Sequence, residues 1–180
     1  MDIFQRFWQW LLSIFIKKEL NITVIGLPNA GKTTFVKALA NQNTTVPTTP
    51  TIGAQFSSLS IGNLKVNVSD MSGSQSFTFL WSIYAKQADL IIYVVDAADY
   101  ESILQCQNNL ESLFEDAHYK NKPLIVIANK QDIPGCISAE DLYTSLQLKD
   151  EGDRKIQIFA LSAKTKQNFS PLLRYLVENF

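Results

Sequence analysis

A phosphate-binding loop pattern, G-x-x-x-x-G-K-[ST], is matched by residues 26–33, which read GLPNAGKT. The apolar residues 20–25 before it predict a buried strand, and residues 33–40 after it predict a helix. In this order, the glycine-rich backbone turns successive N–H groups toward a polyphosphate, and the positive end of the helix dipole faces the same point. Lys32 adds a point charge, and Thr33 offers a hydroxyl to Mg²⁺. The sequence therefore predicts a nucleotide-binding site.

The composition is that of one ordinary domain. Of 180 residues, 46% are hydrophobic and 18% are charged, which is enough for a single well-filled core. The net charge of −1, without a visible basic face, argues against nucleic acid as a partner. Cys106 and Cys136 are thirty residues apart with no metal-ligand histidine nearby, so we expect two reduced thiols in a cytosolic protein.

Strands and helices are predicted to alternate along the chain. Four apolar runs rich in Ile and Val are typical of strands covered on both faces. They span residues 20–25, 90–95, 124–128 and 156–161. Predicted helices cover residues 101–117 and 139–146, and a final helix is expected to have Ser170 as its cap and Pro171 at its first position. This alternation predicts a mostly parallel sheet wrapped by helices, with ligands at the carboxyl ends of the strands.

One segment departs from the alternation and predicts an antiparallel edge. Residues 54–61 and 64–70 flank a Gly62-Asn63 turn, which indicates a β-hairpin. The hairpin is followed by a D-x-x-G pattern formed by Asp70 and Gly73. In that pattern the carboxylate would hold Mg²⁺ through water, and the glycine N–H would meet a γ-phosphate oxygen. The pattern is common, so it has weight only together with the phosphate-binding loop.

Two further motifs lie at predicted strand ends and indicate which base is bound. Residues 129–132 fit N-K-x-D, and the Asp132 carboxylate can accept hydrogen bonds from both the ring N–H and the exocyclic amine of guanine. Residues 162–164, Ser-Ala-Lys, would place a backbone N–H on the guanine O6 and the Lys164 stem against the base. Adenine offers no such pairing, so the site should prefer GTP to ATP. The alternative for residues 129–132 is a polar loop with a helix cap.

The order of these motifs resembles the Ras-type small GTPases, and over essentially the whole chain it resembles their Arf-like (ADP-ribosylation-factor-like) branch. Residues 49–53 are similar to the family's first switch, in which the threonine matching Thr51 completes Mg²⁺ coordination. Residues 96–99, together with Leu80, Trp81 and Tyr84, also look Arf-like. The resemblance implies an α/β P-loop NTPase fold. We expect a mostly parallel six-stranded sheet with one antiparallel hairpin edge strand, helices on both faces, and an N-terminal amphipathic helix.

Motifs and resemblance together assign the site to two residue sets. The nucleotide-binding residues are expected to be Asn29, Ala30, Gly31, Lys32, Thr33, Thr34, Thr51, Gly73, Asn129, Lys130, Asp132, Ser162, Ala163 and Lys164. The metal site is expected to use Thr33, Thr51 and, through water, Asp70. GTP or GDP and Mg²⁺ are therefore the expected cofactors.

The amino terminus predicts an amphipathic membrane-switch helix over residues 1–18, ahead of a GTPase domain over residues 19–180. Large apolar side chains fill ten of the fourteen positions from 3 to 16, with Lys17 and Lys18 following. Fourteen helical residues span about 21 Å, less than the roughly 30 Å of a bilayer's hydrocarbon, so the helix would lie on a membrane. In Arf-like proteins the hairpin slides on nucleotide exchange and expels such a helix. A helix packed permanently on its own domain is the alternative, and a secretory signal is less favoured because no small-residue cleavage site follows.

Membrane association would here proceed without lipid. Residue 2 is Asp2, where many Arf relatives carry a myristoylated glycine, and the carboxyl end has no prenylation cysteine. The lysosome-associated Arf-like subgroup similarly lacks the lipidated glycine and has an aromatic-rich start. The resemblance implies a cytoplasmic monomer, reversibly bound to a lysosomal or late endosomal membrane, with an exchange factor, an activating protein and effectors as partners.

The chain also departs from the family pattern. Ser72, Gly73 and Ser74 stand where relatives usually carry Gly-Gly-Gln, so the glutamine that orients the attacking water is missing. Gln75 is one residue late and is only a weak catalytic candidate. Very slow intrinsic hydrolysis follows, because positioning supplies nearly all of phosphoryl-transfer catalysis.

The effector-facing positions differ too. Ala54 and Ser69 occupy positions where relatives commonly place a Phe and a Trp of an effector-binding surface, so we expect unusual effectors unless these side chains merely fill a tighter hairpin.

Two functions therefore stay open. The first is a GTP-regulated switch that recruits transport effectors to an organelle membrane in vesicle traffic and is turned off by slow hydrolysis. The second is a GTP-binding interaction module with negligible GTPase activity, which Ser74 favours. A P-loop kinase or ATPase is disfavoured by Asp132 and by a length that leaves little room for an acceptor-substrate lid.

Overall fold

The computed structural model describes residues 18–46, 48–74, 76, 79–116, 119, 121–149 and 154–180. The expected N-terminal helix, apart from Lys18, and the catalytic candidate Gln75 lie outside these residues. Lys18, which was expected to end that helix, is the first residue of a strand and pairs with Leu64.

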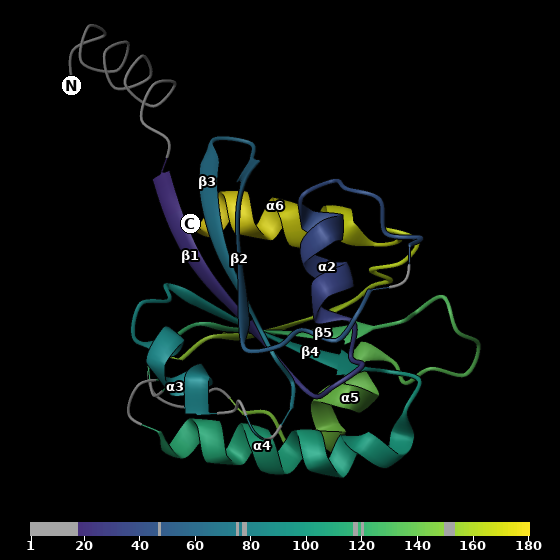
Figure 1. Cartoon of the computed structure of the whole chain (residues 1–180). Helices are drawn as coiled ribbons and strands as arrows, with labels where there is room; N and C mark the ends of the chain where they lie inside the picture. The colour runs from purple at the N-terminus through teal and green to yellow at the C-terminus, as the bar shows by residue number, and fades with distance from the viewer. Residues whose placement is uncertain are drawn as a thin grey trace, which may run out of the picture.

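A single six-stranded sheet forms the centre of the domain (Figure 1). Its strands are β1 (Lys18–Ile25), β2 (Ala54–Ile61), β3 (Leu64–Met71), β4 (Leu90–Asp96), β5 (Leu124–Asn129) and β6 (Ile156–Ala160). The spatial order is β2-β3-β1-β4-β5-β6, and every neighbouring pair is parallel except β2 with β3. The predicted sheet, including its antiparallel hairpin at the edge, is confirmed.

Helices cover both faces of the sheet. They are α2 (Lys32–Leu39), α3 (Phe79–Ala85), α4 (Ile103–Glu115), α5 (Ala139–Ser145) and α6 (Phe169–Asn179), and a short 3₁₀ turn, η2 (Tyr100–Ser102), precedes α4. One buried cluster joins α2 and α6 to the sheet through Phe35 and Leu172. The other joins α3, α4 and α5 to the opposite face through Trp81, Leu110 and Leu142.

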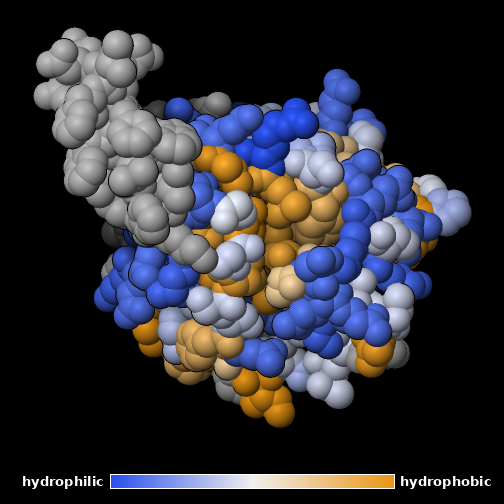
Figure 2. Space-filling model, turned by 90° about the horizontal axis from the view of Figure 1, so that it is seen from above, coloured by the Kyte–Doolittle hydropathy of each residue, from blue (hydrophilic) through white to orange (hydrophobic). Residues whose placement is uncertain are grey.

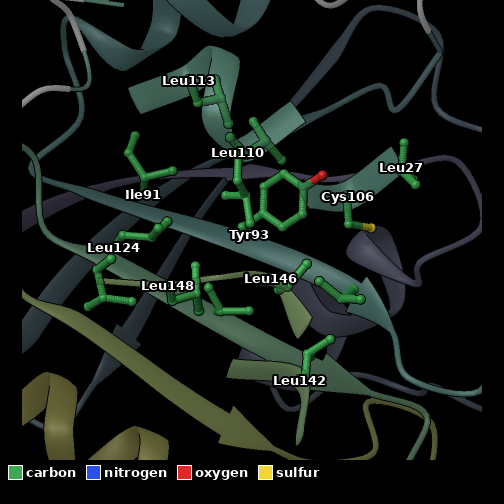
Figure 3. Packing of buried hydrophobic residues seen from close by; sticks show 14 of the residues in the cluster. Leu27, Ile91, Tyr93, Cys106, Leu110, Leu113, Leu124, Leu142, Leu146 and Leu148 are labelled. Atoms are coloured by element: carbon green, nitrogen blue, oxygen red, sulfur yellow. The ribbon is translucent and has the colours of Figure 1, made fainter. Parts of the chain in front are cut away.

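The central strands are apolar on both sides because they lie between these two clusters. On β4, Tyr93 belongs to the cluster under α4, whereas its neighbours Ile92 and Val94 belong to the cluster under α2 and α6. Figure 3 shows Tyr93 beside Leu110 and Cys106 of α4. This alternation explains why β4 reads as a continuous hydrophobic run and not as an amphipathic strand.

The sequence misplaced the start of the last helix. Ser170 was expected to be its cap, but α6 begins at Phe169, and the N-cap is Asn168, whose φ of 61° lies in the left-handed region. Phe169 is only 7% exposed, and its ring centroid lies 5.8 Å from that of Phe35. Burying this ring offsets the loss of a serine cap, which contributes about 1 kcal/mol. Pro171 consequently lies in the first turn but not at its first position.

Three further features of the fold bear on function. Both cysteines in the described residues are free, as expected. None of the helices in the described part of the chain combines the length and apolar content needed to cross a membrane. Seen from above, the end of the molecule where β1 begins shows an apolar area bordered largely by hydrophilic residues (Figure 2).

Candidate functional site

A cleft of about 880 Å³ opens where the parallel strands end. Five segments line it: residues 28–34 without Ala30 after β1, residues 44–52 without the undescribed Pro47, residues 72–74 after β3, residues 129–133 without Gln131 at the end of β5, and Ala163 with Lys164 after β6. The lining residue Asp132 is separated from Lys32 by a hundred positions in the sequence. The topology brings them together because all these strands run in one direction.

Nearly all expected nucleotide-binding residues lie in the cleft wall. Those that line it are Asn29, Gly31, Lys32, Thr33, Thr34, Thr51, Gly73, Asn129, Lys130, Asp132, Ala163 and Lys164. Ala30 and Ser162 are buried directly behind it, at 1% and 0% exposure, and hydrogen-bond to lining residues. Asp70 is likewise buried and reaches the cleft only through Thr33.

Lys32 is held inside the phosphate-binding loop. Its Nζ donates hydrogen bonds to the carbonyl oxygens of Gly26, at 3.0 Å, and Leu27, at 2.8 Å. Burial lowers the pKa of Lys32 to about 8, an effect that the charge of Asp70 partly opposes. Gly73 packs against the same loop so closely that a Cβ there would lie 2.5 Å from the backbone C of Leu27 and 2.5 Å from the backbone N of Pro28. The glycine of the D-x-x-G pattern is therefore required by the close approach of two backbones.

Three oxygen-bearing side chains meet beside the loop. The Thr33 hydroxyl donates to Oδ2 of Asp70 over 2.6 Å and lies 2.9 Å from the Thr51 hydroxyl. The other carboxylate oxygen of Asp70, Oδ1, is buried and has no hydrogen-bond partner. Burial raises the pKa of Asp70, against the lowering effects of the Thr33 hydrogen bond and the Lys32 charge. A buried carboxylate with an unused oxygen beside two hydroxyls fits a hard cation.

The far end of the cleft is built around Asn129. Its Nδ2 donates to the Ala30 carbonyl oxygen over 2.8 Å, and its Oδ1 accepts from the Ala163 N–H over 2.9 Å. One buried side chain therefore ties β5 to both the phosphate-binding loop and the 162–164 segment. Gly31 leaves room for this amide, since a Cβ there would lie 2.4 Å from Nδ2 of Asn129.

Asp132 is oriented from behind by Ser162. The Ser162 hydroxyl donates to Oδ1 of Asp132 over 2.6 Å and also accepts the Thr165 N–H at 3.2 Å. The carboxylate is thereby fixed in one orientation at the cleft wall, with lone pairs left for a ligand.

The two segments that resemble switches are in contact. The Ser72 N–H donates to the Gly53 carbonyl oxygen over 2.8 Å, and the Ser72 carbonyl oxygen accepts from Nε1 of Trp81 over 3.0 Å. Ser74 lines the cleft, and its N–H donates to the Ser72 hydroxyl. Ser74 therefore lies in the cleft wall at the position where the family pattern has a glutamine.

Several contacts at the site were not predicted. Nζ of Lys130 forms an ion pair with Oδ2 of Asp96 at 2.5 Å, and the Thr44 hydroxyl donates to the Lys164 carbonyl oxygen over 2.8 Å. Asp96 is the last residue of β4 and lies at the same edge of the sheet as the other strand-end motifs, so its place in the sequence could have marked it as a site residue. Thr44 carried no signal, because residues 43–51 are rich in Thr throughout.

A parallel sheet with a glycine-rich phosphate-binding loop between β1 and α2, and with a cleft over its strand ends, defines a P-loop nucleotide-binding protein. Comparison with known proteins narrows the class. The chain belongs to the ADP-ribosylation factor family, whose model matches residues 5–180.

Individual relatives agree with that assignment. ADP-ribosylation factor-like protein 8b of Arabidopsis thaliana is 32% identical over 179 residues, which cover 99% of this chain and 97% of the relative. The structure of the Arl6 BBS3 small GTPase from Trypanosoma brucei, solved with the nucleotide analogue GppNp, matches with a TM-score of 0.80 and 25% identity. The match covers 89% of this chain and 96% of the Trypanosoma brucei chain. A chain of the mammalian SRP receptor, at 22% identity and a TM-score of 0.76, shares the fold over 88% of this chain and 98% of its own. The chain is thus an Arf-like small GTPase, a class of GTP-binding switches that act in trafficking.

Proposed function

We propose that the cleft binds GTP and GDP with Mg²⁺, and that the bound nucleotide controls the association of the chain with a membrane and with effectors. The observation that carries this proposal is the link made by Asn129 between the phosphate-binding loop at Ala30 and the backbone N–H of Ala163. This link puts phosphate-binding and base-binding groups in one cleft with a fixed separation. A pre-organised separation is what a nucleoside polyphosphate, with its own fixed length, would require.

Guanine selectivity rests on Asp132. Its carboxylate would accept the ring N–H and the exocyclic amine, while a backbone N–H of the 162–164 segment would donate to O6 of the base. The hydrogen bond from Ser162 keeps the Asp132 carboxylate turned toward the cleft. A carboxylate covered by a bound base and left without donors would be costly, so adenine would be rejected strongly.

Mg²⁺ would be held by Thr33 and Thr51, with Asp70 acting through water. Within the described ranges, no three His, Cys, Asp or Glu side chains come together as a metal site. A cation here would therefore depend on the two hydroxyls, one carboxylate and the nucleotide's own oxygens, as is usual for Mg²⁺. When bound, the ion would neutralise charge on the β- and γ-phosphates.

Hydrolysis is expected to be very slow. Ser74 in the cleft wall has a side chain too short to orient a water on the γ-phosphate, and Lys32 and Gly73 can only stabilise charge there. The chain would then act as a switch that depends on an activating protein for its off step. The second candidate, a GTP-binding module with negligible GTPase activity, is favoured by this same serine.

The proposed membrane contact is the apolar segment of residues 3–16, in a switch helix of residues 1–18 ahead of the domain of residues 19–180. Each large side chain buried contributes roughly 1.5–3 kcal/mol at most, so several together could hold the protein at an interface without lipid. The apolar area at the end where β1 begins offers a place for that segment when it is not in a membrane (Figure 2). The aromatic-rich start with Asp2 at position 2, which resembles the lysosome-associated Arf-like subgroup, is the basis for proposing a cytoplasmic monomer that visits lysosomal or late endosomal membranes in vesicle transport.

The effector-binding surface of this chain would differ from that of relatives that carry a Phe and a Trp at the positions of Ala54 and Ser69. Phe56 of β2 lies opposite Ser69 of β3, is 61% exposed, and its ring centroid lies 5.4 Å from that of Tyr84. An exposed phenylalanine ring supported by a half-buried tyrosine is a typical anchor for a partner. Ala54, two residues earlier on β2, adds little area. Exchange factors and effectors should therefore bind this chain at the Phe56–Tyr84 pair, mainly through Phe56.

Nucleotide binding by the purified chain is the direct test. Fluorescent GDP should bind in the presence of Mg²⁺, be displaced by unlabelled GTP or GDP, and resist displacement by ATP. Chelating Mg²⁺ should speed release. Equal displacement by ATP and GTP would contradict the base site, and a release rate indifferent to chelation would contradict the metal site.

A vesicle-binding assay distinguishes a nucleotide-controlled membrane switch from the alternative, in which the amino-terminal helix stays packed on its own domain. Co-sedimentation of the full chain with anionic vesicles should be greater when it is loaded with a non-hydrolysable GTP analogue than when it is loaded with GDP. Replacing Phe7 and Trp8 by Ser should abolish the difference. Equal binding in both nucleotide states would favour the permanently packed helix.

A further inference from the structure

We propose that Asp96 is a positioning residue for the guanine site. It anchors the ammonium of Lys130 on the side away from the cleft, so that the aliphatic stem of Lys130, and not its charge, faces the base. This inference rests on the proposed function of the cleft and assigns a residue outside its wall to base binding. The Asp96–Lys130 pair lies at the carboxyl ends of β4 and β5. Asp96 pairs with Asn129, the last residue of β5, and Lys130 follows it directly.

The ion pair is well suited to hold a side chain in place. Oδ2 of Asp96 lies 2.5 Å from Nζ of Lys130, and Oδ1 of Asp96 accepts the Ala98 N–H at 3.1 Å. The side chains of Asp96 and Lys130 are only 12% and 25% exposed, so water screens their attraction less than it screens a surface pair. Both oxygens of the carboxylate are engaged, which leaves it one orientation.

Lys130 is part of the cleft wall, whereas Asp96 is not among the residues that line it. An ammonium drawn to Asp96 leaves the methylene chain as the surface that a bound ligand meets. A flat apolar surface suits the face of a purine ring, and a lysine free to move would lose side-chain entropy on each binding event.

The backbone of Lys130 is fixed as well. Its φ is 66°, in the left-handed region that lysine seldom adopts, and hydrogen bonds on both sides maintain it. The Gln131 N–H donates to the Leu161 carbonyl oxygen at 3.2 Å, and the Lys130 carbonyl oxygen accepts the Ile133 N–H at 2.9 Å. The direction in which the side chain leaves the backbone is therefore set, and Asp96 determines where it ends.

The loop after β4 braces the base-binding loop at further points. The Ala97 carbonyl oxygen accepts the Ile137 N–H at 2.8 Å, and the Tyr100 hydroxyl donates to the Gly135 carbonyl oxygen, also at 2.8 Å. Asp96, Ala97 and Tyr100 thus form a second layer behind residues 129–137. Asp96 is the member of that layer whose side chain contacts a residue of the cleft wall.

A double-mutant cycle on nucleotide release tests this role. In wild type, Asp96→Asn should speed the release of fluorescent GDP about fivefold, in the range measured for coupled neighbouring residues. In a Lys130→Met background, which keeps the stem but has no charge to anchor, the same substitution should change the rate less than about twofold. Asp99→Asn, an equal charge change on an exposed side chain of the same loop, is the control and should leave release unchanged.

The outcomes are distinguishable. An equal acceleration by Asp96→Asn in both backgrounds would mean that the carboxylate supports the loop and not Lys130, and would overturn the inference. No acceleration in either background would overturn it as well. Thermal melting of each variant checks that it is folded. A wild-type chain that binds no guanine nucleotide would overturn the proposed function itself, which the binding assay shows before any variant is made.

Discussion

The hydroxyl of Ser162 and the carboxylate of Asp132, thirty residues apart in sequence, are joined by a hydrogen bond of 2.6 Å. Ser162 is fully buried and also accepts the Thr165 N–H, so the serine is held by the loop that follows β6. The residue proposed to select the base is thus oriented by a different strand end from the one that carries it. Base selectivity in this chain is consequently a property of two loops together.

Asp132→Asn should change the base preference of the site from guanine to xanthine. The amide presents a donor where the carboxylate had only acceptors, and xanthine carries a carbonyl where guanine has its exocyclic amine. GTP affinity should fall at least about tenfold, because hydrogen bonds to charged groups are worth about 1.5–3 kcal/mol. Competition of GTP and XTP for the fluorescent nucleotide site measures both changes, and an unaltered guanine preference would refute the role given to Asp132.

Ser74→Gln should accelerate intrinsic GTP hydrolysis. The longer amide side chain, at a position in the cleft wall, can orient a water that serine cannot reach. We expect an increase of roughly tenfold or more in single-turnover phosphate release. Ser112→Gln, on the exposed face of α4, is the matched control. If Ser74→Gln releases phosphate no faster than wild type, another residue orients the water.

Nucleotide affinity should fall as the pH rises past 8. Burial lowers the pKa of Lys32 to about 8 in the free protein, and bound phosphates, which favour its charged form, must raise it. At pH 7 and below the lysine is almost fully protonated, so affinity is nearly constant there. Above it, binding requires proton uptake and weakens, by about fourfold between pH 7 and pH 8.5. GDP titrations across this range should show the drop for wild type, and Lys32→Met should bind weakly without it.

Phe169→Ala should destabilise the fold by about 3–5 kcal/mol, the usual cost of emptying a buried phenylalanine site. The ring is 7% exposed and contacts Phe35 of α2, so its loss separates the helix after the phosphate-binding loop from the last helix. Val177→Ala on the same helix, where the side chain is 41% exposed, should cost less than about 1 kcal/mol. Urea unfolding of the two variants measures both, and equal costs would mean that Phe169 does not anchor α6.

Local patterns were reliable where short-range physics sets them. The hairpin of β2 and β3 was predicted with its turn at Gly62 and Asn63, because the period of the strands and the turn residues agree. The seven-residue helix α3 was not predicted. Only Trp81 and Ala85 of it are buried, and two positions are too few to make a helical period visible.

The sequence alone was sufficient to predict the parallel sheet and its antiparallel edge, and to locate the phosphate-binding loop and the N-K-x-D motif at strand ends, since each leaves a pattern in residues close together in the chain. Tertiary structure decided the rest. It placed Phe169 and not Ser170 at the start of α6, and it brought Asp96 to Lys130 and Asn129 to Ala30 and Ala163. These contacts join strand ends far apart in sequence, and their partners are chosen by the order of strands in the sheet, which no local pattern encodes.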